Sequence, residues 1–122
     1  MSSLTTMTIA ETSAHLVKRD ISAAELTEAH LARINTLDGT LHSFLLVMAE
    51  RAMQRAAEAD LAFQNGDHTR PLLGIPLGLK DLFEVSNYPT TAGSKHLAGQ
   101  HSVLDAVAVT RLESAGAILL GK

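Results

Sequence analysis

The chain has 122 residues, a formal charge of −3 and no cysteine. This length suits one small domain, and the core must come from Leu, Ile, Val and Ala because aromatic residues make up only 3% of the chain. The net negative charge gives no sign of a basic surface that would bind nucleic acid or anionic lipid. The lack of cysteine excludes disulfides, thiolate metal sites and a cysteine nucleophile within the chain.

Neither a membrane span nor a secretory signal is predicted. No apolar run approaches the ~20 residues that cross a bilayer. The first residues, Met1-Ser-Ser-Leu-Thr-Thr-Met7, lack a basic region and a long apolar region. We therefore expect a soluble, cytoplasmic protein.

Two capping boxes predict a helical lead-in over about residues 8–37. In Thr8-Ile-Ala-Glu11 the Thr and Glu side chains can satisfy two free backbone amides, which predicts a helix to about Arg19. Ser22-Ala-Ala-Glu25 repeats the pattern and predicts a second helix, which Leu37-Asp38-Gly39 should close.

A short apolar run and a third helix follow. Phe44-Leu-Leu-Val47 predicts a buried strand. From Ala49 the apolar residues return to helical spacing, and Asn65-Gly66 is typical of a helix C-terminus. The inward stripe of this helix is predicted to contain Ala49, Ala52, Met53, Ala56, Ala59 and Phe63.

The second half of the chain predicts two strands joined by a loop and a helix. Residues 77–81 form a candidate strand, with Pro76 tolerated at its first position. Residues 85–101 show no periodicity and predict a long loop, a kind of segment that is often functional. A helix over about 103–115 and a buried strand over 117–120 complete the pattern.

Helices that alternate with strands predict parallel pairing and an α/β class. The last strand is apolar on both faces and belongs inside a covered sheet, yet only Gly121 and Lys122 follow it. We therefore expect residues 1–122 to be an incomplete part of one domain. An open edge of that sheet would favour poor solubility or self-association.

Lys80 is the candidate catalytic residue. Alternation along the strand places Lys80 and Gly78 on one face, and burial among leucines would favour a neutral amine that can accept a proton from a hydroxyl group. A solvated lysine at a strand end is the alternative for an isolated Leu-Lys-Asp.

Four segments in order resemble the amidase signature family, and together they span roughly residues 8–122. The resemblance implies the N-terminal part of a mixed sheet flanked by helices, with the region from about 41 to 122 holding the lysine strand and the βαβ unit that follows it. The matching segments are Ile21–Leu26 with Arg33-Ile34, Gly74–Asp81, Thr90–Ser94 and Asp105–Lys122.

The family resemblance implies amide hydrolysis by a Ser–cis-Ser–Lys triad through an acyl-enzyme, with Lys80 as the lysine. It implies that both serines lie beyond Lys122, so we expect the chain alone to be inactive. Serines 86, 94, 102 and 114 have no Gly-Ser-Ser context and do not replace them. Serine-based acyl transfer needs no metal or organic cofactor, and no substrate-binding residue can be assigned.

Three functions remain open. The first is a general amidase that acts on a small-molecule amide, and 80–83 and 91–94 look more like such enzymes. The second is the glutaminase (A) subunit of a tRNA-dependent amidotransferase, which passes ammonia to a partner. The third is a non-catalytic truncated product. Direct nucleic-acid or membrane partners are not expected, whereas a second copy of the chain is kept open as a partner.

Other motifs predict no additional site. The run from Gly116 to Lys122 matches the start of a P-loop, but the residues between its glycines read as a strand, so nucleotide binding is rejected. The six histidines lack metal-ligand spacing, and His30 is predicted to be a packed, hydrogen-bonded helix residue. Thr90, Thr91 and Ser94 are predicted to shape their loop, with substrate contact as the alternative.

Overall fold

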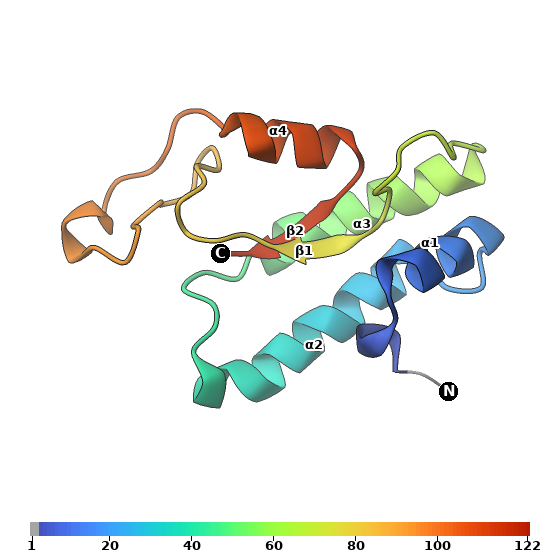
Figure 1. Ribbon diagram of the computed structural model, residues 1–122, viewed down its shortest axis with the longest axis horizontal. Helices are drawn as coiled ribbons and strands as arrows, with labels where there is room; N and C mark the ends of the chain where they lie inside the picture. Colours follow the sequence, from blue (N-terminus) through green and yellow to red (C-terminus); the bar gives the residue numbers. More distant parts are fainter. Residues whose placement is uncertain (1–2) are drawn as a thin grey trace.

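The computed structural model describes residues 3–122 as helices packed around a small parallel sheet (Figure 1). In chain order the elements are η1 (Leu4–Thr6), α1 (Ile9–Lys18), α2 (Ala23–Leu41), α3 (Ala49–Gln64), β1 (Pro76–Gly78), η2 (Lys95–Leu97), α4 (Val107–Ser114) and β2 (Ile118–Gly121).

Both predicted capping boxes form. The Thr8 hydroxyl accepts the backbone N–H of Glu11, and the Glu11 carboxylate accepts that of Thr8 at 2.8 Å. Ser22 and Glu25 form the same reciprocal pair. Because each box satisfies two amides that the helix leaves unpaired, α1 and α2 begin where the sequence predicts.

The predicted end of α2 at Gly39 is wrong, because the helix continues to Leu41. His42 then adopts the left-handed conformation (φ 52°) and donates its backbone N–H to the carbonyl of Asp38. The Asp38 carboxylate also accepts the N–H of Ser43 at 2.6 Å. A side-chain cap, rather than the glycine, therefore ends the helix.

Residues 44–47 do not form the predicted buried strand. They make an isolated antiparallel bridge to β2 between Val47 and Gly121, and Leu45 donates its N–H to the carbonyl of Lys122 at 2.8 Å. Leu45 is 68% exposed. The run is therefore a short extended link along the end of β2, with its apolar side chains only partly covered.

The third helix starts at Ala49 as predicted and packs against α2. Ala52, Ala56, Ala59 and Phe63 of the predicted stripe are buried, whereas Ala49 itself is exposed. The small alanine side chains let α3 lie close to its neighbours, and together they cover one face of the sheet.

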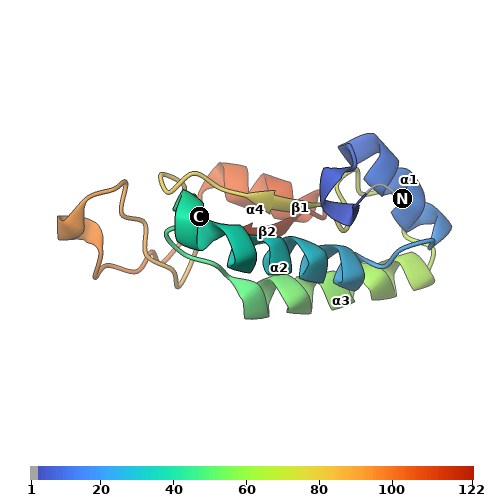
Figure 2. The same ribbon diagram turned by 90° about the horizontal axis from the view of Figure 1, so that it is seen from below.

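The sheet confirms the predicted parallel pairing and the α/β class. β1 and β2 pair in parallel with Pro76 opposite Ile118. Side chains alternate along β2: Ile118 and Leu120 join the core formed with α1, α2 and α3, whereas Leu119 packs with Val109 of α4. Helices therefore cover both faces, α2 and α3 on one side and α4 on the other (Figure 2).

The strand predicted over 77–81 is shorter in the structure and ends at Gly78. Its first residue is Pro76, where the sequence allows it. Leu79 continues beside β2 by donating its N–H to the carbonyl of Gly121 at 3.0 Å. Lys80 and Asp81 therefore follow the strand instead of lying within it.

The helix predicted from Val103 begins only at Val107. The preceding residues are not helical, and the last of them bond to another segment: the Asp105 carboxylate accepts the N–H of Ser86 at 2.7 Å, and Ala106 donates its N–H to the carbonyl of Glu84 at 2.8 Å. These long-range bonds compete with a helical start.

The predicted loop over 85–101 is confirmed as largely irregular and protrudes from the end of the sheet (Figure 1). It contains only the short helix η2, and a bridge between Pro89 and His101 closes its base. Within residues 3–122, no helix is long and apolar enough to cross a bilayer.

Candidate active site around Lys80

Lys80 lies just beyond the carboxyl end of β1, where parallel α/β sheets commonly place their sites. It lines an open cavity of about 330 Å³ together with Asp81 and Lys122. The remaining lining residues are uncharged: Ser43, Leu45, Leu79, Leu82, Ala92 and Gly93.

Lys80 is exposed, which differs from the predicted burial among leucines. The physical reason is the early end of β1, which leaves Lys80 outside the covered part of the sheet. Leu79 is only half-buried and Leu82 is exposed, so neither encloses the amine. The described residues position Lys80 but do not remove it from water.

The backbone on both sides of Lys80 is fixed. Leu79 is hydrogen-bonded to β2, and the carbonyl of Lys80 accepts the N–H of Phe83 at 3.2 Å in the turn that follows. Ala92 donates its N–H to the carbonyl of Asp81 at 3.0 Å. The backbone from which the Lys80 side chain extends is therefore held in place by hydrogen bonds.

Asp81 is held by residues from two other parts of the chain. Its Oδ1 accepts the Lys122 ammonium at 2.8 Å, and its Oδ2 accepts the backbone N–H of Thr91 at 3.0 Å and the Thr91 hydroxyl. Burial acts to raise the pKa of Asp81, but the hydrogen bonds from Lys122 and Thr91 outweigh it and lower the pKa below its ordinary value.

Lys122 is buried, with its side chain 1% exposed. Besides Asp81, its Nζ donates to the carbonyl of Pro89 at 2.9 Å and to the Thr90 hydroxyl at 2.6 Å. An ammonium has three donors, and all three have partners here. This arrangement leaves no donor for a phosphate, which supports the rejection of a P-loop.

Sequence reasoning missed the pair formed by Asp81 and Lys122. A signal was present, because a lysine that ends a fully apolar strand needs an anionic partner if the strand is buried. Asp81 follows the strand that β2 was predicted to join. The choice of partner nevertheless depends on the strand register, which the sequence alone does not give.

Thr90 and Thr91 form hydrogen bonds that shape their loop, both within it and to residues outside it. Thr91 donates to Asp81, and its hydroxyl accepts the N–H of Gly93 at 3.2 Å. The Thr90 hydroxyl accepts a hydrogen bond from Lys122 Nζ, and its oxygen lies 3.3 Å from the Ser102 hydroxyl oxygen. Ser94 contributes through its backbone, donating to the carbonyl of Thr91 at 2.7 Å. Their contact with a substrate stays a prediction.

The serines considered from the sequence are not at the cavity. Ser86 donates its hydroxyl to the carbonyl of Val103 at 3.3 Å, and Ser86, Ser94, Ser102 and Ser114 do not line the space next to Lys80. Ser43, which the sequence pattern did not single out, does line it.

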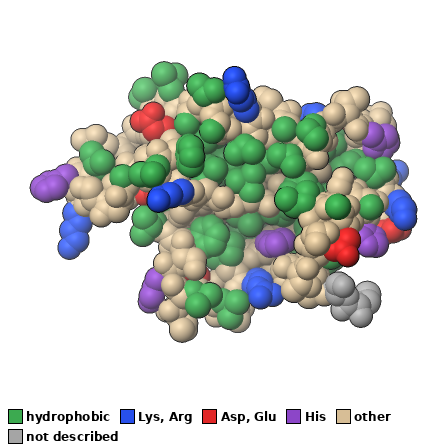
Figure 3. Space-filling model, viewed as in Figure 1, with side chains coloured by type: hydrophobic (Ala, Val, Ile, Leu, Met, Phe, Trp, Pro, Cys, Tyr) green, Lys and Arg blue, Asp and Glu red, His purple; other side chains and the backbone are tan. Residues whose placement is uncertain are grey.

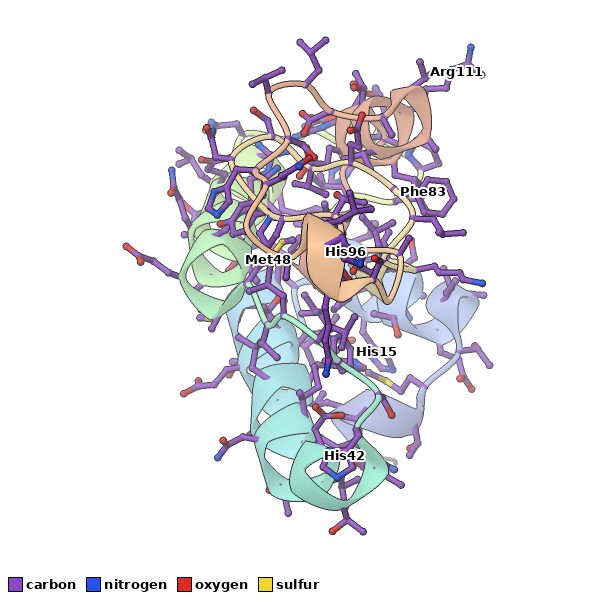
Figure 4. The ribbon with its side chains drawn as sticks, turned by 90° about the vertical axis from the view of Figure 1, so that its left-hand side faces the viewer. His15, His42, Met48, Phe83, His96 and Arg111 are labelled. Atoms are coloured by element: carbon purple, nitrogen blue, oxygen red, sulfur yellow. The ribbon has the colours of Figure 1, made fainter. Side chains whose placement is uncertain are left out.

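The histidines do not converge. Figure 4 shows His15, His42 and His96 on separate parts of the molecule, and in residues 3–122 no three His, Asp or Glu side chains gather into a metal-binding group. His30 is half-buried, and its pKa is lowered first by burial and then by the charge of Arg33.

Comparison with known proteins agrees with this architecture. The family model described as Amidase matches residues 25–122. The chain is 47% identical, over its whole length, to the (A) subunit of the glutamyl-tRNA(Gln) amidotransferase of Nocardia farcinica, of which it covers 25%. It is 43% identical to the corresponding protein of Cutibacterium acnes, of which it covers 24%.

Solved structures give the same result. Native peptide amidase from Stenotrophomonas maltophilia matches 96% of this chain with a TM-score of 0.89 and 37% identity, over 24% of its own length. An amidase family protein from Bacillus anthracis matches 98% of the chain with a TM-score of 0.87 and 31% identity, again over 24% of its length.

The chain thus spans about a quarter of the proteins that it matches. The match covers most of the chain in sequence and nearly all of it in structure. The chain belongs to the amidase signature family and corresponds to the N-terminal part of its members.

Proposed function

We propose that the longer protein represented by this chain breaks a carboxamide C–N bond by acyl transfer, with Lys80 as the base-side residue of a Ser–cis-Ser–Lys triad. The observation that carries the proposal is the position of Lys80 in an amidase-family chain. Its backbone is anchored at the carboxyl end of β1, and its side chain lines an open cavity.

The chemistry assigned to Lys80 is proton transfer. A neutral amine at Lys80 would accept, through the cis serine, the proton of the nucleophilic serine hydroxyl. The serine oxygen would then form an ester with the substrate acyl group while the C–N bond breaks, and the returned proton would leave with ammonia or an amine. Water would hydrolyse the ester and regenerate the serine.

The rest of the longer protein has two tasks in this proposal. It would supply both serines, and it would cover Lys80, because the described residues leave that side chain exposed. Covering the amine would disfavour its charged form. The 122-residue chain alone is therefore expected to hydrolyse no amide.

We propose glutamine as the amide donor, with the released ammonia passed to a partner. Support comes from the curated relatives, which include the (A) subunits of glutamyl-tRNA(Gln) amidotransferases with 47%, 43% and 45% identity over all or nearly all of this chain. The peptide amidase and the Bacillus anthracis protein have lower identities, 37% and 31%. These values favour the glutaminase of an amidotransferase over the general amidase preferred from the sequence.

A free-standing amidase is the second candidate. It is favoured by Leu82 and Phe83, which follow Lys80-Asp81 in the pattern that resembles general amidases. Leu82 is exposed beside the cavity, and Phe83 projects outward near the loop end of the molecule (Figure 4). Such apolar side chains could contact a substrate larger than glutamine.

Replacing Lys80 by Met in the longer protein tests the proposed chemistry. Loss of the proton acceptor should lower kcat for amide hydrolysis by at least about a thousandfold, because triad members act as a unit. The matched control is Lys95→Met, which removes an exposed lysine from η2. Near-normal turnover by Lys80→Met would contradict the proposal.

The substrate can be decided in the same assay. Ammonia release from glutamine that requires misacylated tRNA and partner subunits would support the amidotransferase glutaminase. Hydrolysis of simple or peptide amides by the protein alone, without partners, would instead support the free-standing amidase.

A further inference from the structure

The buried ion pair beside Lys80 is the feature that the proposed function does not use. Lys122 is 1% exposed and Asp81 is 11% exposed, with Nζ and Oδ1 2.8 Å apart. Burying two charges carries a desolvation penalty that can exceed their attraction, and apolar replacements of such pairs are often as stable or more so. Stability alone is therefore a weak reason for this pair.

The pair is fully engaged. Both oxygens of Asp81 accept hydrogen bonds, one from Lys122 and the other from Thr91. Lys122 in turn donates to Pro89 and Thr90 of the same loop. Consequently the carboxylate has one orientation, directed toward Lys122 and the Thr90–Thr91 segment.

That orientation matters for the residue next in sequence. Lys80 precedes Asp81, and both side chains line the same cavity, where Lys122 is the only other charged residue in the described part of the chain. Among the described ion pairs none involves Lys80. A carboxylate released from Lys122 would be the nearest anion in this cavity and would stabilise the charged form of Lys80.

We infer that Lys122 is a positioning residue that holds the Asp81 carboxylate away from the Lys80 amine and so keeps Lys80 available as a proton acceptor. The inference rests on the proposed function, since it assigns a task to Lys122 within the site that Lys80 defines. It also explains why a buried cation lies at the end of an otherwise apolar strand.

The test is the pH dependence of kcat/KM in the longer protein. In Lys122→Met the freed Asp81 carboxylate should favour the protonated form of Lys80. The acidic limb of the kcat/KM profile, where activity rises with pH, should therefore move to higher pH, and kcat/KM at a given pH on that limb should fall about tenfold. In Asp81→Asn the unpaired Lys122 ammonium should disfavour the protonated form of Lys80, so the acidic limb should move to lower pH. The double variant should return the limb close to its original position.

A merely structural role predicts a different result. Both single variants would then lose stability, with no opposite displacement of the acidic limb. If the limb stays in place in both variants, or moves in the same direction, the inference is overturned. If Lys80→Met is inactive and the limb does not move, only the role of Lys122 fails and the proposed function stands.

A milder variant covers the case in which the charge deletions do not fold. Thr91→Val removes one hydroxyl that donates to Asp81 while keeping the side-chain shape. The loosened carboxylate should move the limb in the same direction as Lys122→Met, but less. An unchanged limb in Thr91→Val would also count against the inference.

The chain offers a matched control away from the cavity. Thr69 donates its backbone N–H and its hydroxyl to Asp67 at 3.0 and 2.9 Å, and Arg70 donates to the same carboxylate at 3.0 Å. Thr69→Val and Arg70→Met therefore remove equivalent contacts. Both should leave kcat/KM within about twofold at every pH, because neither residue lines the Lys80 cavity.

Discussion

Lys80 and Lys122 follow adjacent strands but have opposite surroundings. Lys122 is buried and satisfied by three oxygen atoms, whereas Lys80 is exposed and unpaired among the described ion pairs. A buried charge requires partners, and the ammonium group of Lys122 uses all its donors on the contacts described above. Lys80 has no such partner among the described ion pairs, and its role as a proton acceptor stays a prediction.

Asp81 gives the chain a specific response to acid. Its pKa is lowered in the folded state, so its stabilising effect is fully present above the unfolded value of about 3.9 and is lost as pH falls through the lower folded value. Urea unfolding of the chain and of Asp81→Asn should therefore give free energies that differ at pH 6 and converge only when the pH falls below the lowered folded pKa of Asp81. A difference that is constant with pH would contradict this assignment.

The sequence could locate Lys80 but not its surroundings. The local pattern predicts a strand at Lys80, and β1 indeed begins at Pro76, but it ends at Gly78, before Lys80. Its exposure could not be foreseen, because burial depends on which segments reach the end of the sheet. The sequence pattern suggests only a P-loop role for Lys122. It does not predict the ion pair with Asp81, because the two residues are distant in sequence.

At the scale of elements, local signals predict helix starts well and long-range pairing changes the rest. The starts of α1 and α2 depend on capping boxes of four residues, and both boxes form. The expected start of α4 is wrong because Asp105 and Ala106 bond to Ser86 and Glu84 instead. The expected buried strand over 44–47 is wrong because the run makes only an isolated antiparallel bridge to β2 and leaves Leu45 exposed.

A contact between α3 and the first turn of α2 supports the packing of these two helices. The Asp60 carboxylate on α3 accepts the N–H of Ala23 at 2.6 Å and that of Ala24 at 3.0 Å. These amides have no partner within their own helix, and a negative charge near a helix N-terminus is favourable. Asp60 therefore acts as a second cap on α2, supplied by another helix.

Asp60→Ala should lower the free energy of unfolding by about 1–2 kcal/mol, because it leaves two partly buried amides without an acceptor. Glu58→Ala is the control on the same helix, since Glu58 pairs with Arg55 at the surface and should contribute at most about 0.5 kcal/mol. Urea denaturation measures both values. Equal losses in the two variants would argue against the capping role.

At the scale of the whole molecule, two hydrophobic cores share β2. One core lies among α1, α2, α3 and β2, and the other joins Met48, Val85 and Val109 to Leu119. Because one strand contributes to both, the two should unfold together. Hydrophobic side chains also remain visible across the face in Figure 3, and self-association of the isolated chain stays a prediction.

Leu26→Ala tests whether the cores are coupled. Leu26 is fully buried in the first core, and its truncation should cost about 2–5 kcal/mol. Tyr88, the only tyrosine, packs against the second core. Its fluorescence and the helical circular dichroism should therefore shift to the same lower urea concentration.

Leu61→Ala is the matched control, because Leu61 is an exposed leucine on α3 and its truncation should change the free energy of unfolding by no more than about 0.5 kcal/mol. Separate transitions for the two probes in Leu26→Ala would show that the cores unfold independently.

The place of β2 in the chain has a consequence for synthesis on the ribosome. Residues 9–64 emerge first, yet the strand that fills the space between their helices and α4 is made only at 118–121. At a synthesis rate of about 5–20 residues per second, several seconds pass between the completion of α3 and the synthesis of β2. During that interval the nascent helices present uncovered leucine and alanine surfaces, the kind of surface that chaperones bind.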